Sequence, residues 1–247
     1  YWVRSHDCDN ESRPLVTSKI ISPREGLELL RETVASIPHI NVVGIAGPGD
    51  PLANEATFEM FRLAHREFPR LIKCLSTNGL LLPEKAEHLA EVGVTHVTVT
   101  INAVQPEIGA QIYRRIFYGE SIRKGEEAAR TLIANQLDGI RKCAELRMRI
   151  KVNSVLIPSI NGGHLTQVAE GVAAAGAQVQ NIMPLIPQAA LSHLAAPTEE
   201  EVKAARKECE RYIRQFESCR QCRADAVGTL TEGTETIFEG KLLNRQG

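Results

Sequence analysis

The fold is decided by one stretch, Val42-Val43-Gly44-Ile45-Ala46-Gly47-Pro48-Gly49-Asp50-Pro51-Leu52. Its first half has the apolar pattern of a buried strand, and its second half contains glycine and proline turns followed by a carboxylate. Gly47 and Gly49 would let the backbone approach a small molecule closely, and Asp50 could accept hydrogen bonds from a cationic amino group. The pattern predicts a strand that ends in a ligand loop, with a plain turn as the alternative.

Strand and helix patterns alternate over the rest of the chain, after a polar stretch at 1–19 that predicts a loop. Helices are expected at 23–37, 54–68, 83–93, 125–146, 162–175 and 198–216, and further strands at 71–75, 96–102, 150–157 and 177–183. Two helix starts have a capping box, formed by Ser22 with Glu25 and by Thr198 with Glu201. This alternation predicts an α/β fold with parallel strands, as an open doubly wound sheet or as a barrel.

Size and charge limit the class of protein. The chain has 247 residues, of which 43% are hydrophobic, so it can bury a full core and we expect one domain of barrel size. A formal net charge of -1 gives no electrostatic reason to expect a nucleic acid or an anionic membrane as a partner. Since the sequence has neither an apolar run of membrane-spanning length nor a signal-peptide pattern, we expect a cytoplasmic protein. Its start without methionine indicates a fragment or a trimmed product.

Polar residues follow the expected strands, and both barrels and open sheets bind ligands at these carboxyl ends. The strand ends carry Gly47 to Asp50, Ser76 to Asn78, Thr100 with Asn102, and Asn153 with Ser154. Neutral hydrogen-bonding groups with one acid suit a polar, zwitterionic ligand that contains ribose better than a phosphate, because no basic cluster accompanies them in the sequence. Capping of the strand ends is the alternative for each residue taken singly.

Six cysteines in a chain of this length point to metal or redox chemistry, because a cytoplasmic protein does not need disulfides for stability. Cys219 and Cys222 have the spacing with which two thiolates chelate one metal or cluster, and flanking arginines would offset their charge. A redox pair or two ordinary cysteines are the alternatives. Cys74 near a strand end and Cys8 in the N-terminal loop could face the same cavity. The helix patterns predict that two more cysteines are core residues, Cys143 and Cys209.

Several of these stretches recur together, in order, in a known family. The blocks are Asp-Cys-Asp-Asn-Glu-Ser-Arg-Pro at 7–14, the stretch at 42–52, Cys-Leu-Ser-Thr-Asn-Gly at 74–79, His-Val-Thr-Val-Thr-Ile-Asn at 96–102, Lys-Val-Asn-Ser-Val-Leu-Ile-Pro at 151–158, Asn-Ile-Met-Pro-Leu at 181–185 and Cys-Arg-Gln-Cys-Arg-Ala-Asp-Ala-Val-Gly at 219–228. They resemble the NifB family of radical S-adenosylmethionine (SAM) proteins in nitrogenase cofactor biosynthesis. The resemblance implies a barrel over 1–228, without its N-terminal cluster loop, and a tail at 229–247 without the family's accessory carrier domain.

The resemblance implies a fold and a reaction. The fold would be a partial (βα) barrel of the radical SAM type, with parallel strands, outer helices and a C-terminal loop that carries cysteines. A site-differentiated 4Fe-4S cluster would cleave SAM reductively, and two further 4Fe-4S clusters would be substrates. Their fusion, with a carbide from the methyl group of SAM and an added sulfide, would form an 8Fe precursor core. The implied partners are the cluster donor and the cofactor-carrier proteins of nitrogenase assembly.

The resemblance also implies roles for individual residues. Cys219 and Cys222 would hold one substrate cluster, and Cys8 and Cys74 would serve the other. Glu11 is the candidate acid, base or extra ligand near the clusters. The residues that would bind SAM are Gly47, Gly49 and Asp50 at its methionine end, Ser76 and Asn78 at the neighbouring strand end, and Thr100, Asn102, Val152 and Asn153 along the nucleoside.

One departure from the family pattern concerns the radical-generating cluster. The family holds this cluster with a Cys-x-x-x-Cys-x-x-Cys motif, and Trp2 stands where its last cysteine is expected. The other cysteines, with a further histidine and cysteine, would fall before Tyr1, so we expect this chain alone to be inactive. Three hypotheses remain open: a NifB-type enzyme seen without its N-terminal segment, a non-catalytic iron–sulfur scaffold, or a barrel enzyme with a structural metal at Cys219 and Cys222.

Overall fold

The computed structural model of the chain describes residues 2–4, 21–37, 39–46, 49–216, 226–228, 234–238 and 241–244. Its strands are β1 (Trp2–Arg4), β2 (Val42–Ile45), β3 (Ile72–Thr77), β4 (Val94–Thr100), β5 (Arg115–Tyr118), β6 (Ser121–Lys124), β7 (Arg149–Leu156), β8 (Val179–Pro184), β9 (Arg214–Gln215), β10 (Ala226–Gly228), β11 (Thr234–Phe238) and β12 (Lys241–Asn244). Its α-helices are α1 (Pro23–Ser36), α2 (Glu55–Glu67), α3 (Leu82–Glu91), α4 (Pro106–Ile112), α5 (Gly125–Glu145), α6 (Pro158–Asn161), α7 (Leu165–Ala175) and α8 (Glu199–Cys209).

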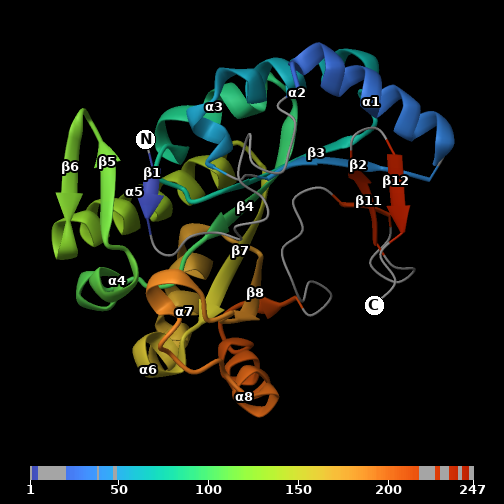
Figure 1. The fold of residues 1–247 in the computed structure, drawn as a ribbon. Coiled ribbons are helices and arrows are strands. Elements are labelled where there is room, and N and C mark those ends of the chain that lie inside the picture. The colour runs from blue at the N-terminus through green and yellow to red at the C-terminus, as the bar shows by residue number, and fades with distance from the viewer. Residues whose placement is uncertain are drawn as a thin grey trace.

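The main sheet is made of parallel strands in the order β2-β3-β4-β7-β8-β9 (Figure 1). This order follows the chain without reversal. Since crossovers between parallel strands are right-handed, all the helical connections must then return on the same face of the sheet. A doubly wound sheet would reverse its order at a switch point. The sequence left both architectures open, and the structure is the partial barrel with outer helices that the family resemblance implied.

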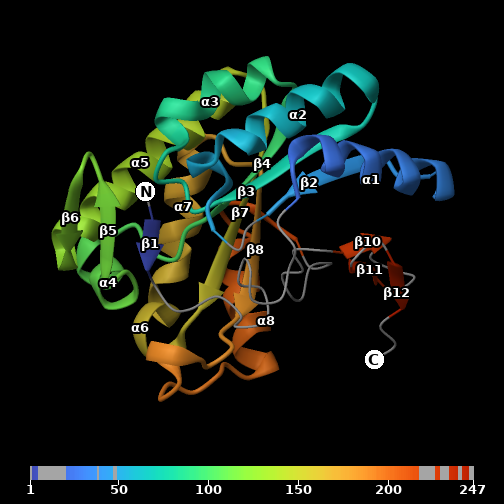
Figure 2. The same cartoon turned by 45° about the horizontal axis from the view of Figure 1, so that its top comes forward.

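Helices form a layer on the outer face of this sheet, as both views show (Figures 1 and 2). Along the layer α1 packs against α2, α3 against α5, α5 against α7, and α7 against α8. The largest hydrophobic cluster fills the space between these helices and the strands, and it includes the fully buried side chains of Phe61, Leu75 and Val172. The apolar residues of the strands are therefore used on the outer face, and the inner face is left for polar side chains.

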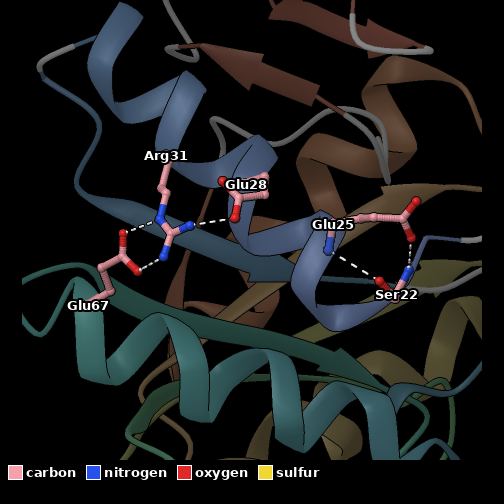
Figure 3. A network of polar contacts seen from close by, with 5 residues as sticks. All are labelled: Ser22, Glu25, Glu28, Arg31 and Glu67. Atoms are coloured by element: carbon pink, nitrogen blue, oxygen red, sulfur yellow. Dashed lines mark hydrogen bonds and ion pairs between the residues drawn. The ribbon is translucent and has the colours of Figure 1, made fainter.

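Local sequence signals determine where helices begin. The backbone N–H of Glu25 donates to Ser22 Oγ at 3.2 Å, and the N–H of Ser22 donates back to the Glu25 carboxylate at 2.7 Å (Figure 3). Thr198 and Glu201 form the same reciprocal pair at the start of α8, at 3.2 and 2.7 Å. Both predicted capping boxes are confirmed, because each provides partners for N–H groups that a helix start leaves unpaired.

Figure 3 also shows the polar contact between α1 and α2. The Arg31 guanidinium on α1 donates to both carboxylate oxygens of Glu67 at the end of α2, at 2.5 Å each, and to Glu28 at 2.5 Å. The paired geometry matches the planar fork of arginine. All three side chains are exposed, so water and salt screen the attraction and its main effect is on the orientation of α1.

A second, antiparallel sheet has the order β1-β5-β6 and lies beside α5. Two sequence-based expectations are corrected here. Residues 1–19 were expected to be loop throughout, but Trp2–Arg4 pairs with Arg115–Phe117 of β5. The segment between the predicted strand at 96–102 and the predicted helix at 125–146 was expected to be a loop with a short helix. It contains the short helix α4 and also the hairpin of β5 and β6, whose Ile116 is fully buried against α5.

The C-terminal part also differs from the expectation. The helix predicted over 198–216 ends at Cys209, and the short strand β9 follows at Arg214–Gln215. Strands β10, β11 and β12 then form a small antiparallel sheet, which lies on the β2 side of the molecule in both views (Figures 1 and 2). The domain boundary predicted at residue 228 stays a prediction. Among the described residues, none of the helices combines the length and apolar character that crossing a bilayer requires.

Candidate functional site

Side chains of the main sheet alternate between the helix-covered outer face and the inner face. On β3, Leu75 and Thr77 are buried under the helices, whereas Cys74 and Ser76 are half-buried on the inner face. Residues that face each other in neighbouring parallel strands point to the same side, so the register assigns the residues of the other strands to one face. The inner face is therefore where side chains of several strands can meet one ligand.

A polar row crosses the inner face near the carboxyl ends of the strands. The register aligns Thr100 of β4 with Asn153 of β7, and Asn153 with Asn181 of β8. The Asn181 side-chain amide donates to the side-chain oxygen of Asn153 at 3.5 Å. A hydroxyl and two amides can donate and accept hydrogen bonds, as ribose hydroxyls and the adenine edge require of a protein site. Thr100 and Asn153, both predicted as nucleoside-lining residues, lie together in this row.

Asp50 lies in the loop that follows β2, and its hydrogen bonds connect this loop to the end of β3. Its carboxylate accepts hydrogen bonds from the Thr77 hydroxyl at 2.8 and 3.0 Å, from the backbone N–H of Asn78 at 2.6 Å, and from that of Leu52 at 3.0 Å. Burial raises the pKa of the Asp50 carboxyl, and these hydrogen bonds oppose the rise. The carboxylate thus has a structural role that the sequence did not indicate, and its contact with a ligand amino group stays a prediction.

The side chains of Asn102 and Val152 are both buried. Asn102 is 2% exposed, and its side-chain oxygen accepts the backbone N–H of Val155 at 2.8 Å. Its backbone carbonyl accepts from the Asn161 amide at 3.0 Å, and its N–H donates to the Tyr113 hydroxyl at 3.0 Å. Val152 belongs to the outer hydrophobic cluster. A contact of either residue with a nucleoside stays a prediction, and for Val152 the backbone would have to make it.

The end of β3 is held from outside by α5. The Gln136 amide donates to the carbonyl of Asn78 at 2.7 Å and to that of Thr100 at 2.9 Å, which joins two neighbouring strand ends. The Asn78 side chain accepts the N–H of Leu80 at 2.8 Å and so shapes the turn. Ser76 keeps a half-buried position on the inner face. Of the two predicted residues here, Ser76 faces the inner side of the sheet, and the Asn78 side chain stabilises the turn.

The glycine loop after β2 is described in part. Gly49 has φ +146°, which favours glycine, and an added Cβ would meet nothing within 4 Å. Among the described residues, the space beside Gly49 is therefore open, as a loop that a ligand approaches needs. Gly47 lies outside the described residues.

Cys74 is a half-buried free thiol on the inner face. Burial raises the pKa of the Cys74 thiol, while the charge of Lys151 and a hydrogen bond with Thr98 oppose that rise. Cys143 and Cys209 are fully buried, and burial raises their pKa to about 12 and about 11, so the predicted core role is confirmed for both. Cys74 therefore differs from the two helix cysteines in being accessible from the inner face.

The remaining predicted site residues lie outside the described part of the chain. They are Cys8, Glu11, Cys219 and Cys222. Within the described part, no group of three or more His, Cys, Asp or Glu side chains could hold a metal ion. A cluster bound at Cys74 would thus need ligands from outside the described residues.

Basic residues on the inner face were missed by the sequence reasoning. Arg149 and Lys151 alternate with Ile150 and Val152 along β7, on the same side as Asn153. Strand parity could have revealed this position, because Asn153 was already predicted to face the ligand. The buried network of Asn161, Tyr113 and Gln136 behind the strand ends had no comparable signal, since it depends on which helix packs behind which strand.

Comparisons with known proteins agree with this geometry. The family model of the radical SAM superfamily matches residues 6–171. The FeMo cofactor biosynthesis protein NifB of Methanocaldococcus jannaschii is 48% identical over 222 residues, which cover 90% of this chain and 74% of that protein. The NifB proteins of Klebsiella pneumoniae and Azotobacter vinelandii are 44% and 41% identical, covering 96% and 94% of this chain and 52% and 47% of theirs.

Solved structures support the fold independently of sequence. Streptococcus suis SuiB bound to SAM matches with a TM-score of 0.60 at 8% identity, and the match covers 80% of this chain and 44% of the SuiB chain. A radical SAM methyltransferase from Sphaerobacter thermophilus has a TM-score of 0.58 at 19% identity, with 78% and 55% covered. With the family match and the NifB relatives, the conclusion is that the chain belongs to the radical SAM superfamily and, within it, to the NifB family.

Proposed function

We propose that this chain acts in FeMo cofactor biosynthesis as the part of a NifB-type radical SAM enzyme that holds SAM and iron–sulfur cluster substrates on the inner face of the sheet. The observation that carries the proposal is the polar row of Thr100, Asn153 and Asn181 on the same face as the accessible thiol of Cys74. The relatives named above are FeMo cofactor biosynthesis proteins, and radical SAM enzymes use a 4Fe-4S cluster and SAM.

The proposed reaction is the fusion of two 4Fe-4S clusters into an 8Fe core, with a carbide from the SAM methyl group and an added sulfide. The substrate clusters would be held by Cys8 with Cys74 and by Cys219 with Cys222, and Glu11 would act as acid, base or extra ligand. The cluster donor and the cofactor-carrier protein of nitrogenase assembly would be the partners, in the cytoplasm. These details rest on the family resemblance.

The residues of the inner face fit the ligand SAM. The Thr100 hydroxyl and the Asn153 amide can bind ribose hydroxyls or the adenine edge, and the open space beside Gly49 can admit the methionine end. Asp50 would act by holding the Gly49 loop against the end of β3, in addition to any direct contact. When bound, SAM supplies the methyl group and the reactive sulfonium. This chain's own residues bind and orient it.

The residues present do not fit the radical-generating cluster. Such a cluster needs three thiolates that leave one iron open to SAM, and the printed sequence contains no Cys-x-x-x-Cys-x-x-Cys motif. Cys74, on β3, belongs to a different block of the family pattern.

Trp2, which stands where the family pattern has the last cysteine of its cluster motif, favours a second candidate function. A scaffold that carries iron–sulfur clusters without cleaving SAM would need the cysteines on the inner face and the loop, and it would not need the three-cysteine motif. The two proposed functions differ in whether the protein cleaves SAM, so an assay of SAM cleavage distinguishes them. Both readings share the cluster-binding role of Cys74.

The test of the proposal is binding of S-adenosylhomocysteine, measured by calorimetry. Asn153→Ala and Thr100→Val should each lower the affinity about threefold to tenfold, because each removes one or two hydrogen bonds of ordinary strength. Asn41→Ala is the matched control, since Asn41 is exposed beyond the start of β2. If both inner-face variants bind as tightly as the control, the ligand site is elsewhere and the proposal is wrong.

A further inference from the structure

The six strands of the main sheet have an uneven distribution of charge. They contain three basic residues on the inner face, Arg149 and Lys151 of β7 and Arg214 of β9, and not one Asp or Glu. The register places Lys151 opposite Thr98 on one side and Val179 on the other, and Val179 opposite Arg214. In a chain of net charge -1, the described strands therefore give the inner face basic side chains and no acidic ones.

Lys151 is the basic residue at the centre of this face. It is half-buried, and its Nζ lies 5.2 Å from the centroid of the Phe216 ring, which follows β9. The Phe216 backbone N–H donates to Gln180 at 2.8 Å, so the ring that contacts Lys151 is fixed to β8. Within residues 49–216, Lys151 makes no ion pair with a carboxylate. A partly desolvated cation without a counterion favours a bound anion.

Cys74 and Lys151 lie on the same side of the sheet, two strands apart. Ser76 and Thr98 are opposite each other, as are Thr98 and Lys151, and Cys74 precedes Ser76 by two residues on the same face. The chain continues from Phe216, beyond Lys151, toward Cys219 and Cys222 in the sequence. Lys151 thus lies on the same face as Cys74, two strands away, and contacts Phe216, after which the sequence continues to the second pair of cysteines.

We propose that Lys151 is a binding residue for an anionic iron–sulfur cluster substrate held through Cys74, and that Phe216 positions its ammonium group. A 4Fe-4S cluster with thiolate ligands carries net negative charge, so a nearby cation stabilises the bound state. The inference rests on the proposed function, because it takes the cluster at Cys74 as the substrate. SAM is less suited to this position, since its ribose and adenine match the neutral row one step closer to the strand ends.

The experiment uses the whole chain under anaerobic conditions and a preformed 4Fe-4S cluster with four small thiolate ligands as the probe. Cluster uptake is followed by iron–sulfur absorbance and by iron per chain after gel filtration. Lys151→Met should lower the affinity by about tenfold and flatten its dependence on salt, because a unit charge close to the site is removed. Lys151→Arg should restore both. Lys203→Met, at an exposed position of α8, should behave as wild type.

Two further measurements separate this inference from the proposed function. Cys74→Ser shows which part of the uptake depends on Cys74, and S-adenosylhomocysteine binding shows whether the nucleoside site is intact. If the wild type takes up a cluster through Cys74 and Lys151→Met does so with equal affinity, the inference fails and the proposed function stands. If Lys151→Met weakens only S-adenosylhomocysteine binding, the cation serves SAM and the inference also fails. A wild type without Cys74-dependent uptake overturns both.

Discussion

The bond between Asp50 and Thr77 should be a measurable part of the stability of the site. Leu52 and Thr77 are 1% and 4% exposed, so their donors cannot turn to bulk water when the Asp50 carboxylate is removed. A buried donor without an acceptor costs about 1–3 kcal/mol. With two such donors, Asp50→Ala should lower the free energy of unfolding by about 2–6 kcal/mol.

A double-mutant cycle tests whether the two side chains act together. Thr77→Val alone leaves the N–H of Gly79 without the acceptor that it has at 3.0 Å, and we expect a loss of about 1–3 kcal/mol. In Asp50→Ala/Thr77→Val the Thr77 hydroxyl no longer needs a partner, so the double variant should lose about 1–3 kcal/mol less than the sum of the single losses.

The assay is urea unfolding of the four proteins, followed by circular dichroism. Equal slopes against urea show that the unfolded states are comparable, and the midpoints then give the free-energy differences. Ser36→Ala is a control at an exposed helix end, and it should change little. If the loss in the double variant equals the sum of the two single losses to within about 0.5 kcal/mol, the reasoning is refuted, because independent sites are additive in that way.

Two further predictions concern pH and the radical reaction. His164 is 3% exposed and accepts the backbone N–H of Val104 at 3.0 Å, and burial lowers the pKa of its imidazole below the ordinary 6.5. The unfolded chain therefore takes up the proton first, so stability is full above pH 6.5 and falls as pH decreases through the lowered folded pKa. His164→Gln should reduce that pH dependence in thermal unfolding and leave the part due to His96, whose pKa burial also lowers, and a wild type whose stability does not change below pH 6.5 would contradict it. Separately, the chain as printed should form no 5′-deoxyadenosine from SAM under reducing conditions, whereas a chain extended with the family's three-cysteine motif, including Trp2→Cys, should form it. Chromatography of both reactions is the measurement; product from the first would show that the motif is wrongly placed, and none from a cluster-loaded second would favour the scaffold.

Much of the fold was predictable because its signals are local. The capping boxes and the alternation of helix and strand patterns give the order of the elements, and the order limits the sheet to parallel crossovers. The choice between barrel and doubly wound sheet was not local, since it depends on which strands pair. Strand β9 is two residues long and β1 three, which is too short for a periodic pattern to be recognised.

The site was predictable for residues that lie near the end of a strand and that the alternation of side chains places on the inner face. Thr100 and Asn153 face inward because they are register partners on strands whose alternate residues fill the core. Parity also explains why Val152 faces the helices, and it would have placed Lys151 beside Asn153. Asn102 lies beyond the end of β4, where the alternation no longer holds, and its side-chain oxygen accepts the backbone N–H of Val155. Such tertiary contacts leave no pattern in the sequence.

The most direct test of the central claim is the iron content of the reconstituted chain. We expect the wild type to bind iron and sulfide for two clusters after anaerobic reconstitution. Cys219→Ser/Cys222→Ser should lose one cluster, and the variant with Ser at Cys8, Cys74, Cys219 and Cys222 should lose both. Cys143→Ser/Cys209→Ser, which changes the two cysteines buried in helices, should keep both clusters if it folds. An iron content that is the same in the wild type and in the fourfold variant would contradict the account.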